Sequence, residues 1–299
     1  MKKLLIATLL CGVQQFAMAA TPLKLCVYDV VGAQGDISTI IKDYVLVAKK
    51  WDVEISSKVY TSLALAIRDF DQKQCDGVVA DNFTTKKYNN FMATIGAVGA
   101  IPNYTIAQNV FQALANPRLA HKFNSGTTYE VVGYIPYGFA YIFTKDRRLN
   151  ALPDIAGKRL GVMEADPSQR RMAQKLGLVP VAMNIDNLAN KFKAGEFDLV
   201  PVPLIAYQAY DGKTILGEKG GVANYPLSMV SMNIILRKGK YPVDFGHKSR
   251  SWFSQQTPRM IQTVKNWQRH IPQYMFYDLS KIDYPAYDRL ISQLRKEFI

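Results

Sequence analysis

The chain has 299 residues and a formal net charge of +13, and 20% of its residues are charged. That length suits two modest domains, and the absence of a dense block of Arg and Lys argues against a nucleic-acid-binding protein. The basic balance favours anionic ligands or an anionic surface, and a nonspecific electrostatic bias is the alternative.

The first nineteen residues have the pattern of a secretory signal peptide. Lys2 and Lys3 precede a short apolar run, and the small residues Ala17 and Ala19 mark a cleavage point. The run is too short to span a bilayer. We therefore expect residues 1–19 to be removed and the mature chain to be a soluble periplasmic protein.

Two cysteines, Cys26 and Cys75, follow the signal peptide. An oxidising compartment permits a disulfide between them, and two buried thiols are the alternative. No CxxC pattern occurs, and His121, His247 and His270 are too scattered for a metal site. We expect neither a metal nor a cofactor.

The next residues predict alternating strands and helices. Periodicity and turn residues indicate strands at residues 23–29, 53–60 and 75–81, with helices over residues 38–50 and 62–74 between them. Strands that alternate with helices in this way predict a parallel sheet with crossover helices.

Two further helices are expected before the middle of the chain. One begins at "FTTKKYNNFM", with Thr84 or Thr85 as its N-cap, and another runs from about Asn103 to His121. Residues 129–145, "YEVVGYIPYGFAYIFTK", then contain two strand-like halves whose aromatic residues alternate. Alternation favours a strand side that faces the core, and Tyr137, between Pro136 and Gly138, is the exception that suits a ligand site.

The second half repeats the plan of the first. "LPDIAGKRLGVME" predicts a turn and a strand, and "LSMVSMNIILRKGKYP" a strand that leads back to the first lobe. The tail from about residue 249 is mostly helical. Between these segments a helix, a strand, a helix and a strand are expected at residues 166–177, 178–184, 185–196 and 197–203.

The predicted fold is therefore α/β, with two Rossmann-like lobes joined by crossing strands and a helical C-terminal tail. Residues 20–135 form lobe I together with a returning segment, residues 235–299, and residues 136–234 form lobe II. An export signal and two α/β lobes are the organisation of a venus-flytrap binding protein.

Three segments, in order, resemble the type II periplasmic solute-binding proteins. They are "CDGVVADNFTTKKYNNF", "LPDIAGKRLGVMEADPSQRRMAQKLG" and "KLGLVPVAMNIDNLANKFKAGEFD". The third is similar to the dicarboxylate-type binding proteins of TRAP (tripartite ATP-independent periplasmic) transporters. The resemblance covers most of the mature chain. It implies a receptor without a cofactor that captures a small solute between its lobes for a membrane transporter.

Departures from the family pattern bear on the ligand. TRAP binding proteins commonly place an Arg, which pairs with a substrate carboxylate, where this chain has Gly161; Arg159 lies two residues earlier. Amino-acid-binding relatives often hold an acid after the "FD" pair, but here "VPVP" follows Asp198. The basic balance, the helix starts at Thr84–Thr85 and Ser168, and the missing acid in "VPVP" predict an anionic ligand, most simply a carboxylate, with Arg159 or Lys87 as its cationic partner.

The candidate ligand-binding residues follow from sheet geometry, because ligands of open α/β sheets bind at the carboxyl ends of strands. "VPVPLIAY" would form an apolar wall there, or a packed strand end. Thr84, Thr85 and Ser168 could equally be ordinary helix caps. The predicted site comprises Asp29, Gln34, Asn82, Thr84, Thr85, Lys87, Tyr137, Arg159, Glu164, Ser168, Gln169 and Tyr207.

The sequence favours a non-catalytic receptor. No GxSxG pattern is present, and the histidines lack metal-ligand spacing. The alternatives are an exported sensor or assembly partner that keeps the fold without transport, and an enzyme on the same scaffold. We expect a monomer that works with membrane transporter subunits.

Overall fold

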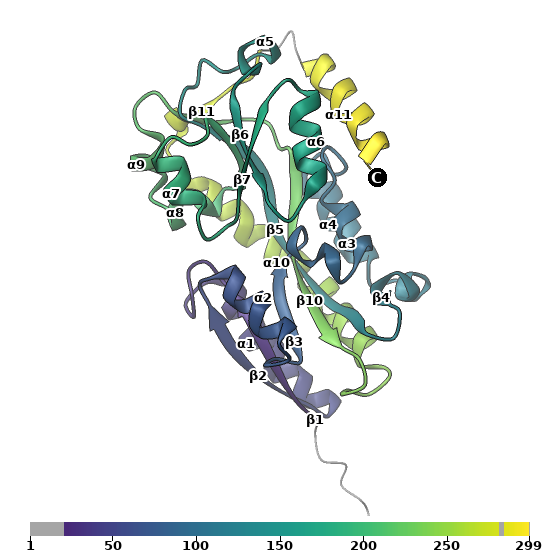
Figure 1. The fold of residues 1–299 in the computed structure, drawn as a ribbon. Coiled ribbons are helices and arrows are strands. Elements are labelled where there is room, and N and C mark those ends of the chain that lie inside the picture. Colours follow the sequence, from purple (N-terminus) through teal and green to yellow (C-terminus); the bar gives the residue numbers. More distant parts are fainter. Residues whose placement is uncertain (1–20, 281–283, 299) are drawn as a thin grey trace, which may run out of the picture.

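The computed structural model describes residues 21–280 and 284–298 (Figure 1). The expected signal peptide, residues 1–19, lies outside the described residues. Within the described ranges, no helix combines the length and the apolar character that crossing a bilayer requires.

Lobe I begins with three parallel strands in the order β2-β1-β3. The predicted alternation of strands and helices is confirmed. All five residues of the third strand are buried, which is typical of a strand covered on both faces. The elements are β1 (Thr21–Tyr28), α1 (Asp36–Ala48), η1 (Lys49–Trp51), β2 (Val53–Tyr60), α2 (Leu63–Asp71) and β3 (Gly77–Asp81).

The segment after β3 differs from the expected long helices. Asp81, and not a threonine, caps the first turn: its Oδ1 accepts hydrogen bonds from the Phe83 and Thr84 N–H groups. The expected helix to His121 is interrupted before Pro117, because proline disfavours helical geometry in the preceding residue. The elements are η2 (Thr84–Lys87), α3 (Asn90–Ile95), α4 (Tyr104–Ala113), η3 (Pro117–Phe123) and β4 (Asn124–Ser125).

Two long antiparallel strands, β5 (Tyr129–Thr144) and β10 (Ser228–Arg237), connect the lobes. β10 pairs with β3 and with β5, and the last five residues of β5 pair with β8 of lobe II. The two halves expected in residues 129–145 are thus one continuous strand. Because β5 is shared, the hydrogen-bonded path runs unbroken from β2 of lobe I to β7 of lobe II (Figure 1).

Lobe II continues the sheet in the order β5-β8-β6-β7. Helix α6 lies beside one face of this sheet, and helices α7, α8 and α9 lie on the other side (Figure 1). The elements are α5 (Leu152–Ile155), β6 (Arg159–Met163), α6 (Pro167–Lys175), β7 (Val179–Met183), α7 (Leu188–Lys193), β8 (Leu199–Pro203), α8 (Ile205–Ala209), α9 (Gly212–Leu216) and β9 (Gly221–Ala223).

The C-terminal tail contacts both lobes. The Ser249 hydroxyl of α10 (Phe245–Arg269) lies 2.7 Å from the Tyr44 hydroxyl of α1. Further along, β11 (Phe276–Tyr277) pairs with β9 beside lobe II. The remaining elements are η4 (Gln273–Met275) and α11 (Tyr284–Phe298).

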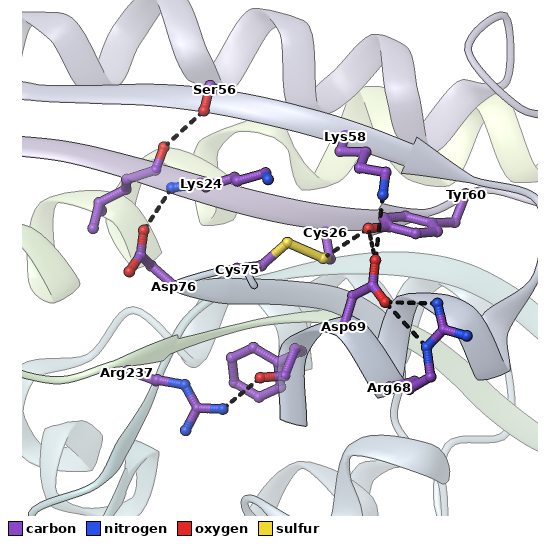
Figure 2. The surroundings of a disulfide bond; sticks show 12 residues. Lys24, Cys26, Ser56, Lys58, Tyr60, Arg68, Asp69, Cys75, Asp76 and Arg237 are labelled. Carbon is purple, nitrogen blue, oxygen red and sulfur yellow. Dashed lines mark hydrogen bonds and ion pairs between the residues drawn. A yellow bond between two sulfur atoms is a disulfide. The ribbon is translucent and has the colours of Figure 1, made fainter. Parts of the chain in front are cut away.

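A disulfide joins two segments of lobe I (Figure 2). The Cα atoms of Cys26, in β1, and Cys75, just before β3, are 5.8 Å apart. The sequence left a disulfide and two thiols open, and the structure contains the disulfide. Its cysteines are 49 residues apart, and a crosslink of this span stabilises a fold by roughly 2–4 kcal/mol.

Candidate functional site: a cavity at the strand ends

A cavity of about 290 Å³ lies where strands of both lobes end. Tyr28 and Asp81 are the last residues of β1 and β3, and Met163 and Pro203 are the last residues of β6 and β8; all four line it. The carboxyl ends of strands are the usual ligand position in α/β sheets. The cavity is therefore the candidate ligand site.

A bulge in β5 turns Tyr137 toward this cavity. Val230 of β10 pairs with Gly138 and Ser231 pairs with Pro136, so Tyr137 has no partner across the ladder. Gly138 has φ +93°, and an added Cβ would lie 2.7 Å from a Val264 methyl group. Glycine is thus required here, and the bulge re-aims the neighbouring side chain.

Five tyrosines line the cavity, among them the buried Tyr28 and Tyr137 and the half-buried Tyr210. Burial raises the pKa of Tyr28, Tyr137 and Tyr210 above the usual value of a phenol, and the nearness of the phenols to one another adds to the effect at Tyr28. These hydroxyls consequently stay protonated at neutral pH. The Tyr137 and Tyr210 hydroxyls can each donate a hydrogen bond to an anionic ligand, whereas the Tyr28 hydroxyl donates to Tyr210.

The charged groups at the cavity come from both lobes. Lys86, from lobe I, lies with its Nζ 3.8 Å from Asp166 Oδ1 of lobe II. Asp166 also caps α6, because it accepts from the Ser168 N–H at 3.1 Å. Lys86 brings a positive charge to the cavity wall, although Asp166 partly neutralises it.

Asp81 is a buried acid at the same wall. Its Oδ1 accepts the two backbone hydrogen bonds that cap the following turn, while its Oδ2 has no hydrogen-bond partner among the described residues. Burial raises the pKa of this carboxyl group, although the Thr84 and Phe83 N–H groups act against it. Asp81 thus places at the cavity wall a buried carboxyl oxygen that has no hydrogen-bond partner among the described residues.

A second polar contact joins the two lobes at the N-terminus of α2. Asp186, which follows β7, accepts hydrogen bonds from the Ser62 hydroxyl at 2.7 Å and from the N–H groups of Leu63 at 2.9 Å and Ala64 at 3.1 Å. An acid from lobe II thus sits at the N-terminus of a lobe I helix, where the helix dipole favours a negative charge.

Three predicted residues lie at the cavity: Tyr137, Ser168 and Gln169. The Gln169 carbonyl oxygen accepts from the Met163 N–H at 2.9 Å, which leaves the amide nitrogen as the donor that can face a ligand. The "VPVP" stretch contributes Pro201, Val202 and Pro203, so this loop forms an apolar wall of the cavity.

Arg159, expected to pair with the ligand, is not among the residues that line the cavity. It opens β6, at the opposite strand end from the ligand site. Its Nε donates to Asp198 Oδ2 at 3.1 Å and an Nη donates to Oδ1 at 2.7 Å. The Arg of the "GKRLG" segment and the Asp of the "FD" pair are therefore partners in one surface ion pair.

The predicted polar residues after β3 also turn away from the cavity. Lys87 pairs with Asp71 at 2.8 Å on the surface. The Thr85 hydroxyl donates to the Asp81 carbonyl at 2.8 Å and accepts from Asn233, while Asn82 Oδ1 accepts from the Ser231 N–H. Buried contacts to β10 thus occupy Thr85 and Asn82. Thr84 forms part of the capped turn.

The remaining four predicted residues do not line the cavity. Asp29 is buried and accepts from the Val31 and Ser38 N–H groups, which ties the loop after β1 to α1. Gln34 and Glu164 are exposed. Tyr207 is buried, with a hydroxyl that has no hydrogen-bond partner among the described residues.

Several residues that line the cavity were not predicted from the sequence, because the local backbone brings a residue one to three positions away to the cavity in place of the predicted one. The segment after β3 forms a 3-10 turn, so Lys86 faces the cavity where Lys87 was expected. The chain after β8 forms the short helix α8, which brings Tyr210 to the cavity in place of Tyr207. Tyr28 precedes the predicted Asp29, and alternation along β1 was the signal that could have identified it.

The described residues contain no group of three His, Cys, Asp or Glu side chains placed to hold a metal ion. The polar groups at the cavity are phenols, one amide, two serines, two acids and the cations Lys86 and Arg295. Such a set can bind and orient a solute through hydrogen bonds and charge.

Comparison with known proteins identifies relatives of this chain. Residues 46–299 match the family model described as solute-binding protein AdeT 1/2. Probable solute-binding protein AdeT1 of Acinetobacter baumannii is 32% identical over 268 residues, which cover 90% of this chain and 88% of that protein. Probable solute-binding protein AdeT2 of the same organism is 29% identical over 208 residues, covering 70% of this chain and 87% of that protein.

Solved structures share the fold at low sequence identity. A TRAP periplasmic solute-binding protein from Desulfovibrio salexigens, with bound orotic acid, has a TM-score of 0.76 and 14% identity and covers 93% of this chain and 92% of its own. A TRAP periplasmic solute-binding protein from Pseudomonas aeruginosa PAO1, with bound L-malate, has a TM-score of 0.71 and 10% identity. The match covers 93% of this chain and 100% of that protein. The predicted two-lobed fold is confirmed, and the chain belongs to the AdeT 1/2 family of solute-binding proteins.

Proposed function

We propose that this protein captures a small organic carboxylate between its two lobes and presents it to membrane transporter subunits. The observation that carries the proposal is the cavity at the strand ends, where protonated phenols from both lobes and Lys86 face a common space. Hydrogen bonds from neutral phenols and a nearby ammonium group stabilise a carboxylate without requiring a second buried cation.

The solved neighbours support the same ligand class. Their bound ligands are orotic acid in the Desulfovibrio salexigens protein, (S)-2-acetolactate in that of Ralstonia eutropha H16 and L-malate in that of Pseudomonas aeruginosa PAO1. All three carry a carboxyl group. The cavity in this chain is open space and is not filled by side chains, which favours a solute receptor over a protein that only retains the fold.

The cellular setting is part of the proposal. The signal-peptide pattern supports export to the periplasm, and the solute-binding relatives support a non-catalytic protein. We propose a monomer in which residues 20–135 and 235–299 form lobe I and residues 136–234 form lobe II. The bulged crossing strands β5 and β10 would serve as the hinge.

Titration calorimetry with a panel of organic acids tests this function. Lys86→Ala should weaken binding of an acid by about tenfold or more, because a charged hydrogen bond contributes about 1.5–3 kcal/mol and Asp166 already offsets part of the charge. Lys87→Ala is the matched control, since Lys87 pairs with Asp71 on the surface. If no acid binds, or if the two variants bind equally well, the proposal is wrong.

A further inference from the structure

The cavity continues from the cleft into lobe II. Its inner part is lined by one face of the lobe II sheet, through Ile142, Leu160, Val162, Leu199 and Pro201. Met172 and Leu176, from α6 and its C-terminal end, and Leu290, Ile291 and Leu294 of α11 line it from the opposite side. The inner part thus lies between a sheet and two helices, in a position that the side chains of a hydrophobic core ordinarily fill.

The two faces of this sheet are packed differently. On the opposite face, Gly161 lies against the Phe197 ring and a Val200 methyl group: an added Cβ would be 3.2 Å from both, which is a tight contact. Phe197 in turn stacks on Phe192. On the cavity face, five residues form a small separate cluster: Leu160, Val162, Ala173, Leu178 and Leu199. The open space is therefore confined to one face.

Helix α11 forms the outer wall and is held at both lobes. The Tyr225 hydroxyl donates to Asp288 Oδ1 at 2.8 Å, and the Arg295 guanidinium donates to the Val98 carbonyl at 3.4 Å. Ile291 and Leu294 are buried. A helix fixed in this way encloses the inner cavity and keeps its apolar walls away from water.

Most polar groups of the cavity lie near the cleft. Lys86 and Asp166 follow strands β3 and β6, Ser168 and Gln169 lie in the first turn of α6, and Tyr28 ends β1. The sheet residues and the later α6 residues of the inner part are apolar, and Arg295, which α11 adds to the lining, donates to the Val98 carbonyl of lobe I. A sugar acid or a hydroxy acid that entered the inner part would lose hydrogen bonds to water without replacement, which is unfavourable. An apolar chain or ring would gain from the same burial.

We propose that the solute is an amphipathic monocarboxylate, with its carboxylate at the cleft end and an alkyl chain or aromatic ring in the inner cavity beneath α6 and α11. This inference rests on the proposed function and narrows it. It sets the ligand apart from malate, which has two charged ends. Polyhydroxylated acids are likewise disfavoured.

A chain-length series tests the proposal on the native protein. Calorimetric titrations with butanoate, hexanoate, octanoate and 3-phenylpropanoate should show affinity that rises about fourfold for each added methylene, until the cavity is filled. Malate and glucuronate serve as polar comparisons. If either of these binds and chain length has no effect, the receptor function stands and the amphipathic proposal is overturned. If none of the acids binds, both fail.

A pair of tryptophan variants tests where the alkyl chain of the ligand binds. Met172→Trp places a large ring in the inner cavity, whereas Gln174→Trp, on the same helix, adds the ring at an exposed position. Met172→Trp should weaken octanoate binding by tenfold or more and leave butanoate within about twofold; Gln174→Trp should change neither. Equal octanoate affinity in both variants, with circular dichroism showing folded protein, would place the chain elsewhere and overturn the proposal.

Discussion

Asp69 illustrates how single residues of lobe I are held in place. The Tyr60 hydroxyl donates to its Oδ2 at 2.6 Å, and Arg68 donates to its Oδ1 at 2.9 Å (Figure 2). These hydrogen bonds lower the pKa of the Asp69 carboxyl group to about 2. Tyr60 also lies 3.4 Å from Cys26 Sγ, so this carboxylate orders the surroundings of the disulfide.

The pH dependence of stability should report on Asp69. Because its folded-state pKa lies below the unfolded value, its contribution is present above about pH 4 and is lost as the pH falls toward 2. Asp69→Asn should therefore be less stable than wild type at pH 7, with a difference that shrinks on acidification. Urea denaturation from pH 2 to pH 7 measures this, with exposed Asp52→Asn as the control. A difference that stays constant over that range would contradict the assignment.

At the residue scale, the position of the cavity at the strand ends was predictable from the sequence, whereas most of the residues that line it were not. Strand ends and the apolar "VPVP" wall follow from patterns that any α/β sheet obeys. Lys86 and Lys87 are adjacent, however, and only the 3-10 turn decides which one faces the cavity. Arg159 lies two residues from the position of the family Arg, but in the structure it pairs with Asp198, which is 39 residues later in the sequence. Pairings of that kind emerge only in three dimensions.

At the scale of elements, α10 is fixed to the crossing strand β5 by a buried ion pair. The Arg250 guanidinium donates to Glu130 Oε1 at 2.6 Å and to the Val131 carbonyl at 2.9 Å. The Tyr241 hydroxyl donates to the other carboxylate oxygen of Glu130. The side chain of Arg250 is only 5% exposed, so water cannot replace these contacts.

Removing the cation should be strongly destabilising. Arg250→Met should lower the free energy of unfolding by about 3–5 kcal/mol, because Glu130 would remain buried without its charged partner. Arg259→Met is the matched control on the same helix. Arg259 pairs with Asp43 at the surface, where the two side chains are 63% and 41% exposed. This substitution should lower the free energy of unfolding by less than about 1 kcal/mol. Similar losses in chemical denaturation of the two variants would contradict the buried role of Arg250.

Element types were predictable where periodicity was strong, as in the strands of both lobes. The errors arose where one residue overrode the pattern. Pro117 ended the expected long helix, and Asp81 took the capping role expected of a threonine. The bulge that aims Tyr137 depends on pairing with β10, which lies about 90 residues later in the chain, and no local pattern encodes it.

At the scale of the whole molecule, two of the polar contacts between the lobes have charged side chains beside the cleft. They are the Asp186 contacts with the N-terminus of α2 and the pair between Lys86 and Asp166. Both are partly exposed, so each contributes little free energy. Such weak contacts suit a molecule that opens to admit a solute and closes around it. The solute shifts this equilibrium toward the closed form because it binds that form more tightly than the open form.

The distance between the lobes, measured by double electron–electron resonance, tests the central claim most directly. Spin labels on Leu46→Cys of α1 and Val179→Cys of β7 occupy exposed positions in opposite lobes, and the native Cys26 and Cys75 are already joined. Without a ligand, the distribution should be broad and include an open population. With the tightest-binding acid of the chain-length series at saturation, it should narrow to the closed distance. Distributions that superimpose with and without bound acid would contradict capture between the lobes.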